Sequence, residues 1–228
     1  MEIRTGNIFS TKCQTIVNTV NCVGVMGAGI ALECRLRHPE MYERYRELCD
    51  ENLIAVGKLW LYKESDRWIL NFPTKKHWKR ASKPEYLQKG LDKFLATYEE
   101  KGVTSIAFPL LGASHGGLDP ERSLDIMSEY LKQCNIPVEI WKYDPEATDD
   151  LYPQFRASFK VRNEEKLAEA TGLRRNYLNK VIDALDRPDV NSISRLSSVK
   201  GIGVKTLERC FEFVRNEVQQ RHVQNELF

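Results

Sequence analysis

Residues 16–32 read IVNTVNCVGVMGAGIAL, an apolar segment that passes through a glycine-rich turn into a helical pattern. Gly24, Gly27 and Gly29 give the spacing G-x-x-G-x-G, which differs from both the dinucleotide-binding fingerprint and the P-loop. Glycines at such a turn let backbone N–H groups converge on an anion, and the following helix N-terminus adds partial positive charge. The pattern favours a diphosphate ligand, and a tight strand-to-helix connection without a ligand is the alternative.

Two further loops carry unusual residues. PLLGASHGGL, at 109–118, is a second glycine-rich turn and could supply backbone donors opposite the first. The stretch 75–83, here called the cationic segment, reads KKHWKRASK, with five cations and no acid. Cations beside an aromatic ring suit single-stranded nucleic acid, because phosphates meet the cations and a base stacks on the ring. The candidate DNA contacts are Lys76, Trp78, Lys79 and Arg80; the alternative is a solvated loop whose Trp78 packs into the core.

The pattern of the first 144 residues is that of an α/β fold. Six short apolar segments between residues 2 and 143 alternate with helical stretches. In 85–100, for example, Leu87, Leu91 and Phe94 fall on one helical face. Such alternation predicts a three-layer α/β/α domain over 1–144 with a mixed, largely parallel sheet. Ligands of these sheets bind in the loops at the carboxyl ends of the strands.

The chain changes character after residue 144. Residues 145–162 are acidic, contain prolines and lack periodicity, which predicts a linker. From Asn163, a plausible helix cap, the pattern is helical, so we expect a small all-α domain over 163–228. Residues 151–228 carry 14 Lys/Arg against 10 Asp/Glu, whereas residues 1–150 carry 20 against 22. The excess favours a polyanionic partner for the tail, although a solvated helical surface would carry the same charges.

Within this tail, residues 196–207 read LSSVKGIGVKTL and resemble the helix-hairpin-helix motif of DNA repair proteins. In that motif a turn with two glycines presents backbone N–H groups to a DNA phosphate. Gly201 and Gly203 permit the turn here, and Lys205 and Thr206 can add contacts. We therefore expect sequence-independent DNA binding, with an ordinary interhelical turn as the alternative.

Composition limits the class of protein. The 228 residues are 42% hydrophobic and 29% charged, as in ordinary globular proteins. No apolar run is as long as a membrane span and no signal peptide is recognisable, so we expect a cytoplasmic protein. Six cysteines without a C-x-x-C pair indicate reduced thiols, and we expect no zinc site, other metal or cofactor.

Four segments together identify residues 1–144 as a member of the macrodomain family, which binds ADP-ribose. The segments are TGN (5–7), NTVNCVGVMGAGIAL (18–32), NFPTKKHW (71–78) and PLLGASHGGL (109–118). Within the family they are most similar to the DNA ADP-ribosyl glycohydrolase, or DarG-like, branch of antitoxins. The resemblance implies a hydrolase that removes ADP-ribose from a DNA base, with thymidine in single-stranded DNA as the expected substrate. It also implies a DarT-type ADP-ribosyltransferase toxin as a candidate partner, although the tail does not resemble the toxin-sequestering domain of DarG antitoxins.

The same resemblance assigns the ligand contacts. The first loop, residues 21–29, would hold the distal ribose and part of the diphosphate, and the second loop, residues 112–117, would hold the diphosphate from the other side. Asn7 stands where most macrodomains carry an aspartate that accepts a hydrogen bond from adenine. The predicted contacts are Asn7, Ile8, Asn18, Gly24, Val25, Met26, Gly27, Ala28, Gly29, Thr74, Leu111, Gly112, Ala113, Ser114, Gly116 and Gly117.

Three residues are the catalytic candidates. Lys75 best matches the position of a lysine that is essential in this branch, and Lys76 is the second choice. A partly desolvated lysine beside other cations has a lowered pKa, so that its neutral amine could attack or polarise C1″ of the ribose. Asn21 would orient the ribose. His115 is a candidate proton donor, because a related deacylating branch has an aspartate where Gly116 falls here.

Two other functions fit the same resemblance. One is a deacylating macrodomain that acts on ADP-ribose esters of protein carboxylates or on O-acetyl-ADP-ribose. The other is a non-enzymatic reader that binds ADP-ribose without turnover.

Overall fold

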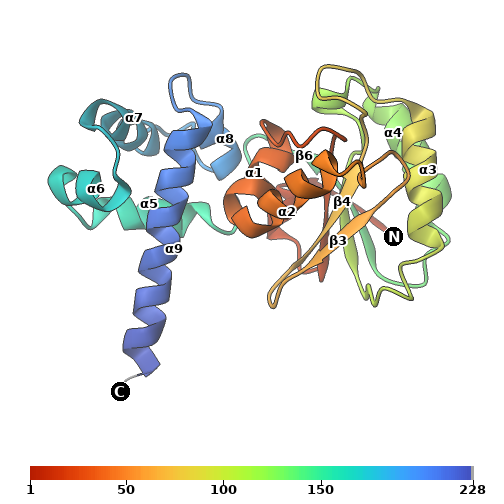
Figure 1. The fold of residues 1–228 in the computed structure, drawn as a ribbon, viewed down its shortest axis with the longest axis horizontal. Coiled ribbons are helices and arrows are strands. Elements are labelled where there is room, and N and C mark those ends of the chain that lie inside the picture. Colours follow the sequence, from red (N-terminus) through yellow and green to blue (C-terminus); the bar gives the residue numbers. More distant parts are fainter. Residues whose placement is uncertain (227–228) are drawn as a thin grey trace. The chain divides into compact units, whose positions relative to one another are not determined.

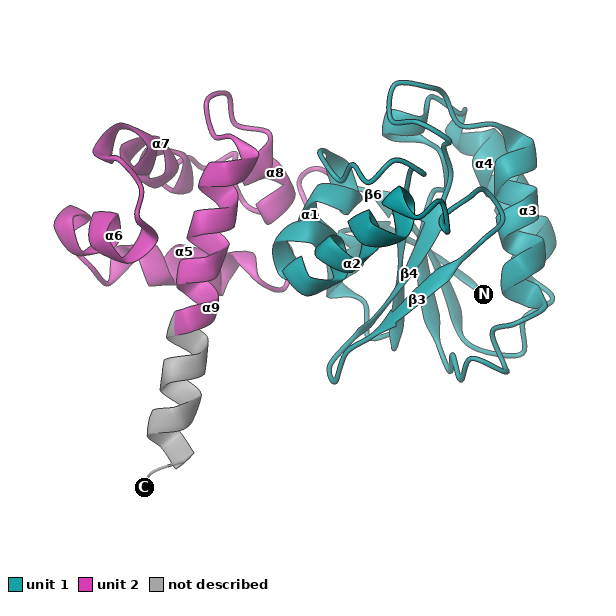
Figure 2. Ribbon diagram, in the orientation of Figure 1, with its two compact units in different colours: residues 1–144 teal, residues 145–228 magenta. Residues whose placement is uncertain are grey.

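The computed structural model describes residues 1–226, with side chains as far as residue 216. The chain divides into two compact units, unit 1 (Met1–Asp144) and unit 2 (Pro145–Phe228), which are coloured teal and magenta in Figure 2. The last two residues of the predicted helical domain lie outside the described part.

Unit 1 is built on a six-stranded sheet with the order β1-β6-β5-β2-β4-β3. Neighbouring strands are parallel, except that β3 runs antiparallel to β4, so the predicted mixed, largely parallel sheet is confirmed. The strands are β1 (Glu2–Gly6), β2 (Thr15–Val20), β3 (Trp60–Lys63), β4 (Trp68–Pro73), β5 (Ile106–Pro109) and β6 (Val138–Tyr143).

Helices cover both faces of this sheet (Figure 1). They are α1 (Gly29–Arg37), α2 (Pro39–Asp50), α3 (Pro84–Leu95) and α4 (Pro120–Leu131), with two short 3₁₀ helices, η1 (Ile8–Ser10) and η2 (Ser114–Gly116). Successive residues of a strand point to opposite faces. In β2, Ile16 accordingly packs against α1 and α2, while Val17 packs with the residues of α3 and α4. The three-layer prediction is therefore confirmed, with one apolar core on each side of the sheet.

The packing of α3 on the sheet depends on a glycine. A Cβ added to Gly90 would lie 2.1 Å from Cζ of Phe72, whose ring is completely buried. We expect Gly90→Ala to lower the free energy of unfolding by about 1–3 kcal/mol, because the ring cannot move without displacing its neighbours. The shift of the urea midpoint measures this loss. Lys93→Ala, at an exposed position of the same helix, is the control, and an equal midpoint for both variants would contradict the close packing.

Unit 2 is all-helical in its described part, as predicted. Its helices are α5 (Tyr152–Lys160), α6 (Glu164–Thr171), α7 (Arg175–Leu185), α8 (Ile193–Ser197) and α9 (Val204–Glu226). Asn163 caps α6, since its side-chain oxygen accepts a hydrogen bond from the backbone N–H of Lys166 at 3.0 Å.

The prediction of an aperiodic linker over 145–162 is wrong for the residues of α5. Asp149, which looked like a linker acid, is buried and accepts hydrogen bonds from the backbone N–H groups of Tyr152 and Ile193 at 2.7 and 2.6 Å. Phe155 of α5 packs against Phe211 of α9, with ring centroids 5.0 Å apart. Ile193 and Phe211 lie more than forty positions along the chain from their partners, so the local sequence did not show that the segment folds.

The six cysteines are free thiols. Burial raises the pKa of Cys210 to about 12 and that of Cys134 to about 11, so both thiols stay protonated at neutral pH. Among the described residues, no group of three or more His, Cys, Asp or Glu side chains is arranged to hold a metal ion. Within the same part of the chain, no helix is long and apolar enough to cross a bilayer.

Candidate active site

The carboxyl ends of five parallel strands meet at one edge of the sheet of unit 1, here called the loop edge. The first loop follows β2, the cationic segment follows β4, and the second loop follows β5. Asn7 follows β1 and Tyr143 ends β6 at the same edge. The parallel topology therefore brings together the segments singled out in the sequence.

Asn21 shapes the first loop from within. Its side-chain oxygen accepts a hydrogen bond from the N–H of Val23 at 3.0 Å, and its amide group donates to the carbonyl of Val25 at 2.5 Å. The backbone carbonyl of Asn21 accepts a hydrogen bond of 2.7 Å from the hydroxyl of Tyr45. Burial raises the pKa of Tyr45, so this hydroxyl remains a donor. Most hydrogen-bonding groups of Asn21 therefore bond to the loop itself or to Tyr45. Its role in orienting a ribose stays a prediction.

Side chains of α1 and α2 support the first loop from behind. Arg35 donates to the carbonyl of Met26 at 3.5 Å, and its guanidinium stacks 4.2 Å from the ring centre of Tyr42. The hydroxyl of Tyr42 donates in turn to the carbonyl of Gly24 at 3.5 Å. The loop is therefore held in one conformation before any ligand arrives.

The first loop leads into an N-terminus of α1 that is suited to an anion. Ala28 occupies the N-cap position without a side-chain hydrogen bond, and the first turn carries no acidic residue. The first N–H groups of a helix have no partner within the helix, and they carry the positive end of its dipole. This arrangement supports the diphosphate interpretation over a bare structural turn.

The second loop is a tight structure around η2. Gly112 has a φ of +67°, and Ser114 has a φ of +47°, which is rare for a residue with a side chain. The N–H of Gly116 donates to the carbonyl of Ala113 at 2.7 Å. A non-glycine residue in this region costs about 1–3 kcal/mol and persists only where its surroundings fix it. Such strain is common in ligand-binding loops.

Sequence reasoning missed Ser82, the residue that fixes the second loop to the cationic segment. The N–H of Ser82 donates to the carbonyl of Gly116 at 2.8 Å. A Cβ on Gly112 would lie 2.8 Å from Cβ of Ser82, and a Cβ on Gly116 would lie 2.7 Å from its hydroxyl oxygen. In the sequence, Ser82 differs from its neighbours only as a small side chain among charged ones. This difference does not reveal its contacts with the second loop, because Gly112 and Gly116 lie about thirty residues away.

Lys75 and His115 lie where the two loops meet. The Nζ atom of Lys75 donates to the backbone carbonyl of His115. The imidazole of His115 packs against the start of α1, since a Cβ on Gly29 would lie 3.0 Å from its Cδ2 atom. The thiol of Cys22 in the first loop donates to the carbonyl of Lys75 at 3.3 Å. The first loop, the second loop and the cationic segment thus converge on Lys75.

Burial lowers the pKa of Lys75 below its usual range. The sequence argument assigned part of this shift to neighbouring cations, and that part was wrong: desolvation is the cause, and Lys76, Lys79 and Arg80 are exposed. A lowered pKa makes the neutral, nucleophilic amine more accessible.

Several predicted ligand contacts have side chains in the core rather than at the loop edge. These are Ile8, Asn18, Met26, Thr74 and Leu111. Asn18 lies inside β2, completely buried, and donates to the side-chain oxygen of Asn71 at 2.9 Å. Because these side chains are buried, their backbone is the part that lies nearest to a ligand at the loop edge, and their predicted contact with ADP-ribose stays a prediction.

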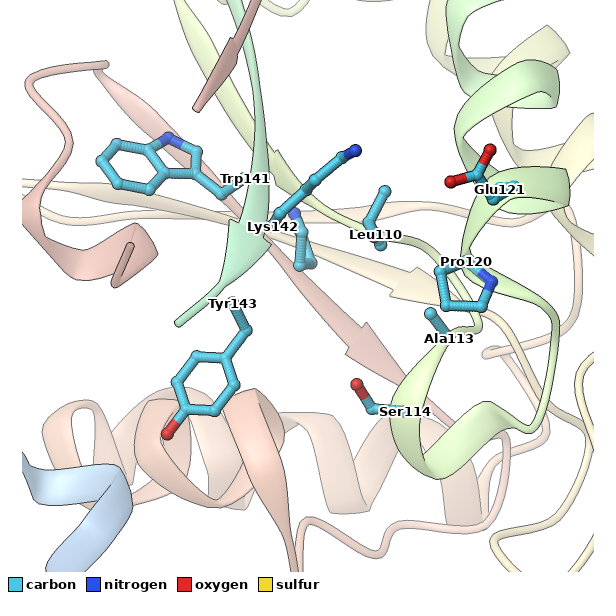
Figure 3. A pocket seen from close by; sticks show the side chains of 9 residues that line it. Leu110, Ala113, Ser114, Pro120, Glu121, Trp141, Lys142 and Tyr143 are labelled. Carbon is cyan, nitrogen blue, oxygen red and sulfur yellow. The ribbon is translucent and has the colours of Figure 1, made fainter. Parts of the chain in front are cut away.

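A pocket of about 340 Å³ opens at the loop edge between β6, the second loop and the start of α4 (Figure 3). It is lined by Pro109, Leu110, Ala113, Ser114, Pro120, Glu121, Trp141, Lys142 and Tyr143. Tyr143 is 52% exposed and faces Ser114 across the pocket. An exposed ring in this position offers a flat apolar surface to a base. Sequence reasoning missed Tyr143, although an aromatic residue at the last position of a strand was a usable signal.

Asn7 lies beside this pocket. Gly6 pairs with Tyr143 across the sheet, and the N–H of Asp144 donates to the carbonyl of Gly6 at 3.2 Å. The side-chain oxygen of Asn7 accepts a hydrogen bond from the N–H of Phe9 at 3.1 Å, which caps η1. That oxygen has a second lone pair, so its predicted contact with adenine stays a prediction.

Trp78 stands out from the surface of unit 1. Its side chain is 49% exposed, so the alternative that it packs into the core is wrong. Its ring stacks on His77 with centroids 5.7 Å apart, and Nζ of Lys79 lies 4.9 Å from the ring centre. The expected combination of exposed cations with an exposed aromatic ring is therefore present, while its contact with DNA stays a prediction.

The hairpin-like turn of unit 2 joins α8 to α9. Gly201 has a φ of +90°, which favours glycine, and Lys205 is exposed. Thr206 corrects the sequence prediction: its side chain is buried and its N–H donates to the carbonyl of Gly203 at 3.0 Å. Both groups serve the helix, so Thr206 is not available to a phosphate.

Comparison with known proteins agrees with this geometry. A family model described as the Macro domain matches residues 17–127. The chain is 38% identical over 144 residues to a DNA ADP-ribosyl glycohydrolase of Thermus aquaticus, a match that covers 61% of this chain and 40% of the relative. The chain thus spans about two fifths of the length of that curated relative.

Solved structures give the same result. The macrodomain of Mycobacterium tuberculosis DarG superposes with a TM-score of 0.58 and 36% identity, covering 61% of this chain and 96% of that chain. The structure of Thermosipho africanus DarTG in complex with ADP-ribose superposes with a TM-score of 0.59 and 32% identity, covering 63% of this chain and 42% of that chain.

Proposed function

Because the chain belongs to the macrodomain family, we propose that unit 1 binds ADP-ribose at the loop edge and hydrolyses the bond that joins it to a DNA base. The activity for which the Thermus relative is named and the ADP-ribose in the Thermosipho structure support this proposal. The diphosphate lies between the N-terminus of α1 and the second loop. The adenine lies beside Asn7 and Tyr143, and the distal ribose lies near Lys75.

The observation that carries the proposal is the position of Lys75. It is a partly buried lysine with a lowered pKa, at the junction of two loops that suit a diphosphate. In the proposed reaction the neutral amine of Lys75 attacks C1″ of the distal ribose, and the bond from C1″ to the base breaks. The base leaves with the electron pair of that bond and takes up a proton. Water then attacks C1″, breaks its bond to the lysine, and releases ADP-ribose and the free amine. Asn21 orients the ribose through its loop, and His115, whose backbone carbonyl accepts the hydrogen bond from Lys75, is the proposed proton donor.

We propose that the DNA strand, modified or not, binds on the cationic segment next to Lys75. Lys76, Trp78, Lys79 and Arg80 follow Lys75 directly and are exposed. A single strand suits this surface, because an unpaired base can stack on Trp78 while the phosphates meet the cations. A DNA substrate also agrees with the cytoplasmic location expected from the sequence. A DarT-type ADP-ribosyltransferase is the proposed source of the modified DNA. A relative from Thermosipho africanus, named a DNA ADP-ribosyl transferase–DNA ADP-ribosyl glycohydrolase fusion protein, supports this proposal.

The test is to incubate the full chain with a thymidine oligonucleotide that carries ADP-ribose and to measure free ADP-ribose by chromatography. The same measurement on a peptide with ADP-ribose on a glutamate separates the alternatives. Release from the oligonucleotide supports the proposal. Release from the peptide alone would indicate a deacylating enzyme, and binding of ADP-ribose without release from either substrate would indicate a reader.

Trp78→Ala is expected to raise KM for the modified oligonucleotide on the order of tenfold, because stacking of a base on an aromatic ring contributes about 1–3 kcal/mol. The affinity for free ADP-ribose should not change, since the ring lies outside the two loops. Tyr86→Ala, at a half-buried aromatic position of α3, is the matched control. An unchanged KM in Trp78→Ala would mean that the strand follows another path.

Unit 2 is proposed to add a second contact with DNA. The turn around Gly201 and Gly203, with the exposed Lys205, would hold one backbone phosphate through backbone N–H groups and charge. Such a contact ignores base identity.

A further inference from the structure

Unit 2 contains the same helical arrangement twice. In the first half, α6 passes through a turn at Gly172 into α7; in the second half, α8 passes through a turn at Gly201 into α9, 29 residues later in the chain. Both glycines have a left-handed backbone, with φ of +62° and +90°. The hairpin-like turn recognised in the sequence therefore has a counterpart that the sequence analysis did not identify.

The repeat extends to the packing of the helices. Buried side chains that are at most 1% exposed recur at the same offset in both halves. The pairs are Leu167 with Leu196, Leu178 with Leu207, and Val181 with Cys210. Residues at the same distance in sequence from each glycine are therefore buried in both halves. The helices on either side of the two turns pack through equivalent positions.

Each half places a cation at the turn of the other half. Lys180 on α7 stands eight residues after Gly172, and Arg209 on α9 stands eight residues after Gly201. A Cβ on Gly201 would lie 3.2 Å from Nζ of Lys180. A Cβ on Gly172 would lie 3.5 Å from Nη1 of Arg209. This exchange is reciprocal, and Lys180 and Arg209 are both exposed.

Further exposed cations flank both turns, namely Arg174 and Arg175 after Gly172, and Lys200 and Lys205 around Gly201. Arg175 forms an exposed ion pair of 3.2 Å with Glu165, a kind of contact that contributes little and is easily exchanged. The neighbouring helices also carry acids, among them Glu165 and Glu169 on α6, Asp183 on α7 and Glu208 on α9. The four cations, together with Lys180 and Arg209, lie at or beside the two turns themselves, where they can meet phosphates.

We infer that unit 2 binds double-stranded DNA through both turns at once, with Lys180 and Arg209 as phosphate-binding residues of the two halves. The inference extends the single-turn contact proposed above and rests on it. Two turns in one compact unit hold two phosphates at a fixed separation. A duplex presents phosphates at fixed positions, whereas a single strand does not, so the duplex is the better partner. The contacts are to the backbone, so binding is independent of sequence.

The test measures binding of the full chain to two unrelated, unmodified duplexes and to a single strand of the same length, by fluorescence anisotropy at several salt concentrations. Lys180→Ala and Arg209→Ala should each weaken duplex binding on the order of tenfold and lower the salt slope by about 1, because each removes one phosphate contact. The double variant should lower the slope by about 2. Lys166→Ala, which removes an exposed cation away from both turns, should leave binding unchanged.

Three outcomes would overturn the inference. One is a loss of binding in Lys180→Ala but not in Arg209→Ala, which leaves a single active turn. Another is tighter binding of the single strand than of either duplex in a full chain that carries Trp78→Ala, which removes the stacking contact proposed for a single strand on unit 1. The third is that Asn176→Ala changes the relative affinity for the two duplexes, which differ in sequence. Asn176 is an exposed residue of α7, so this result would mean that α7 contacts bases as well as phosphates. Thermal unfolding of every variant checks the fold. Failure of the wild-type chain to release ADP-ribose would overturn the proposed function alone, since duplex binding is measured on unmodified DNA.

Discussion

Lys75→Ala is expected to slow the release of ADP-ribose from a modified oligonucleotide on the order of 1,000-fold or more, because it removes the proposed nucleophile. Binding of ADP-ribose should survive. The first loop is fixed by Asn21 and Tyr45, and the second keeps its backbone hydrogen bond with Ser82 when the bond from Lys75 to His115 is lost. Single-turnover kinetics and calorimetry with ADP-ribose separate the two effects. Turnover that persists in this variant would remove Lys75 from the chemistry.

Lys76→Ala is the matched control, since the neighbouring lysine is exposed and should affect only DNA binding. Lys75→Arg should be as inactive as Lys75→Ala, because a guanidinium does not lose its proton in proteins.

The pH dependence of turnover tests the same assignment. Burial lowers the pKa of Lys75 from its usual 10.5, and the reactive form is the neutral amine. The value of kcat/KM should therefore rise with pH up to the pKa of Lys75 and then level off, at a pH below 10.5. A rate that falls over the same range would show that the charged ammonium is the active form.

Gly112→Ala is expected to reduce the affinity for ADP-ribose on the order of 100-fold, because the second loop cannot keep its conformation. Its φ of +67° disfavours any side chain, and the new Cβ would lie 2.8 Å from Cβ of Ser82. Calorimetry measures the loss. A melting temperature close to that of the wild type would show that the effect is confined to the loop.

Ser82→Gly in the Gly112→Ala background separates the two causes. Removing Cβ of Ser82 relieves the close approach and should recover part of the affinity, while the backbone strain at residue 112 remains. Ser82→Gly alone should bind ADP-ribose nearly as well as the wild type, since the Ser82–Gly116 hydrogen bond uses backbone atoms. If the double variant bound no better than Gly112→Ala, steric contact with Ser82 would not be what holds the loop.

The unequal success of the sequence predictions has a physical reason. The loops were found because glycine spacing and the alternation of strands with helices are local patterns. The burial of Asn18 and Met26 was not visible in the sequence, because neighbours in the sequence can face opposite sides. Asn18 lies inside a strand, and Met26 turns into the core while its neighbours Val25 and Gly27 are exposed. Thr206 was misjudged for this reason, since the residue after an exposed Lys205 faces the interior of the helix bundle.

The sequence by itself determined the order of strands and helices and the two glycine-rich loops, because each depends on residue types at short spacing. It also determined the family, because four such segments recur in order between residues 5 and 118. Only the tertiary structure decided that Lys75 meets His115, that Ser82 fixes the second loop, and that Lys180 and Arg209 reach each other's turns. Each of these contacts joins residues about twenty to forty positions apart along the chain. Their meeting depends on the packing of whole elements, which no local pattern of residues specifies.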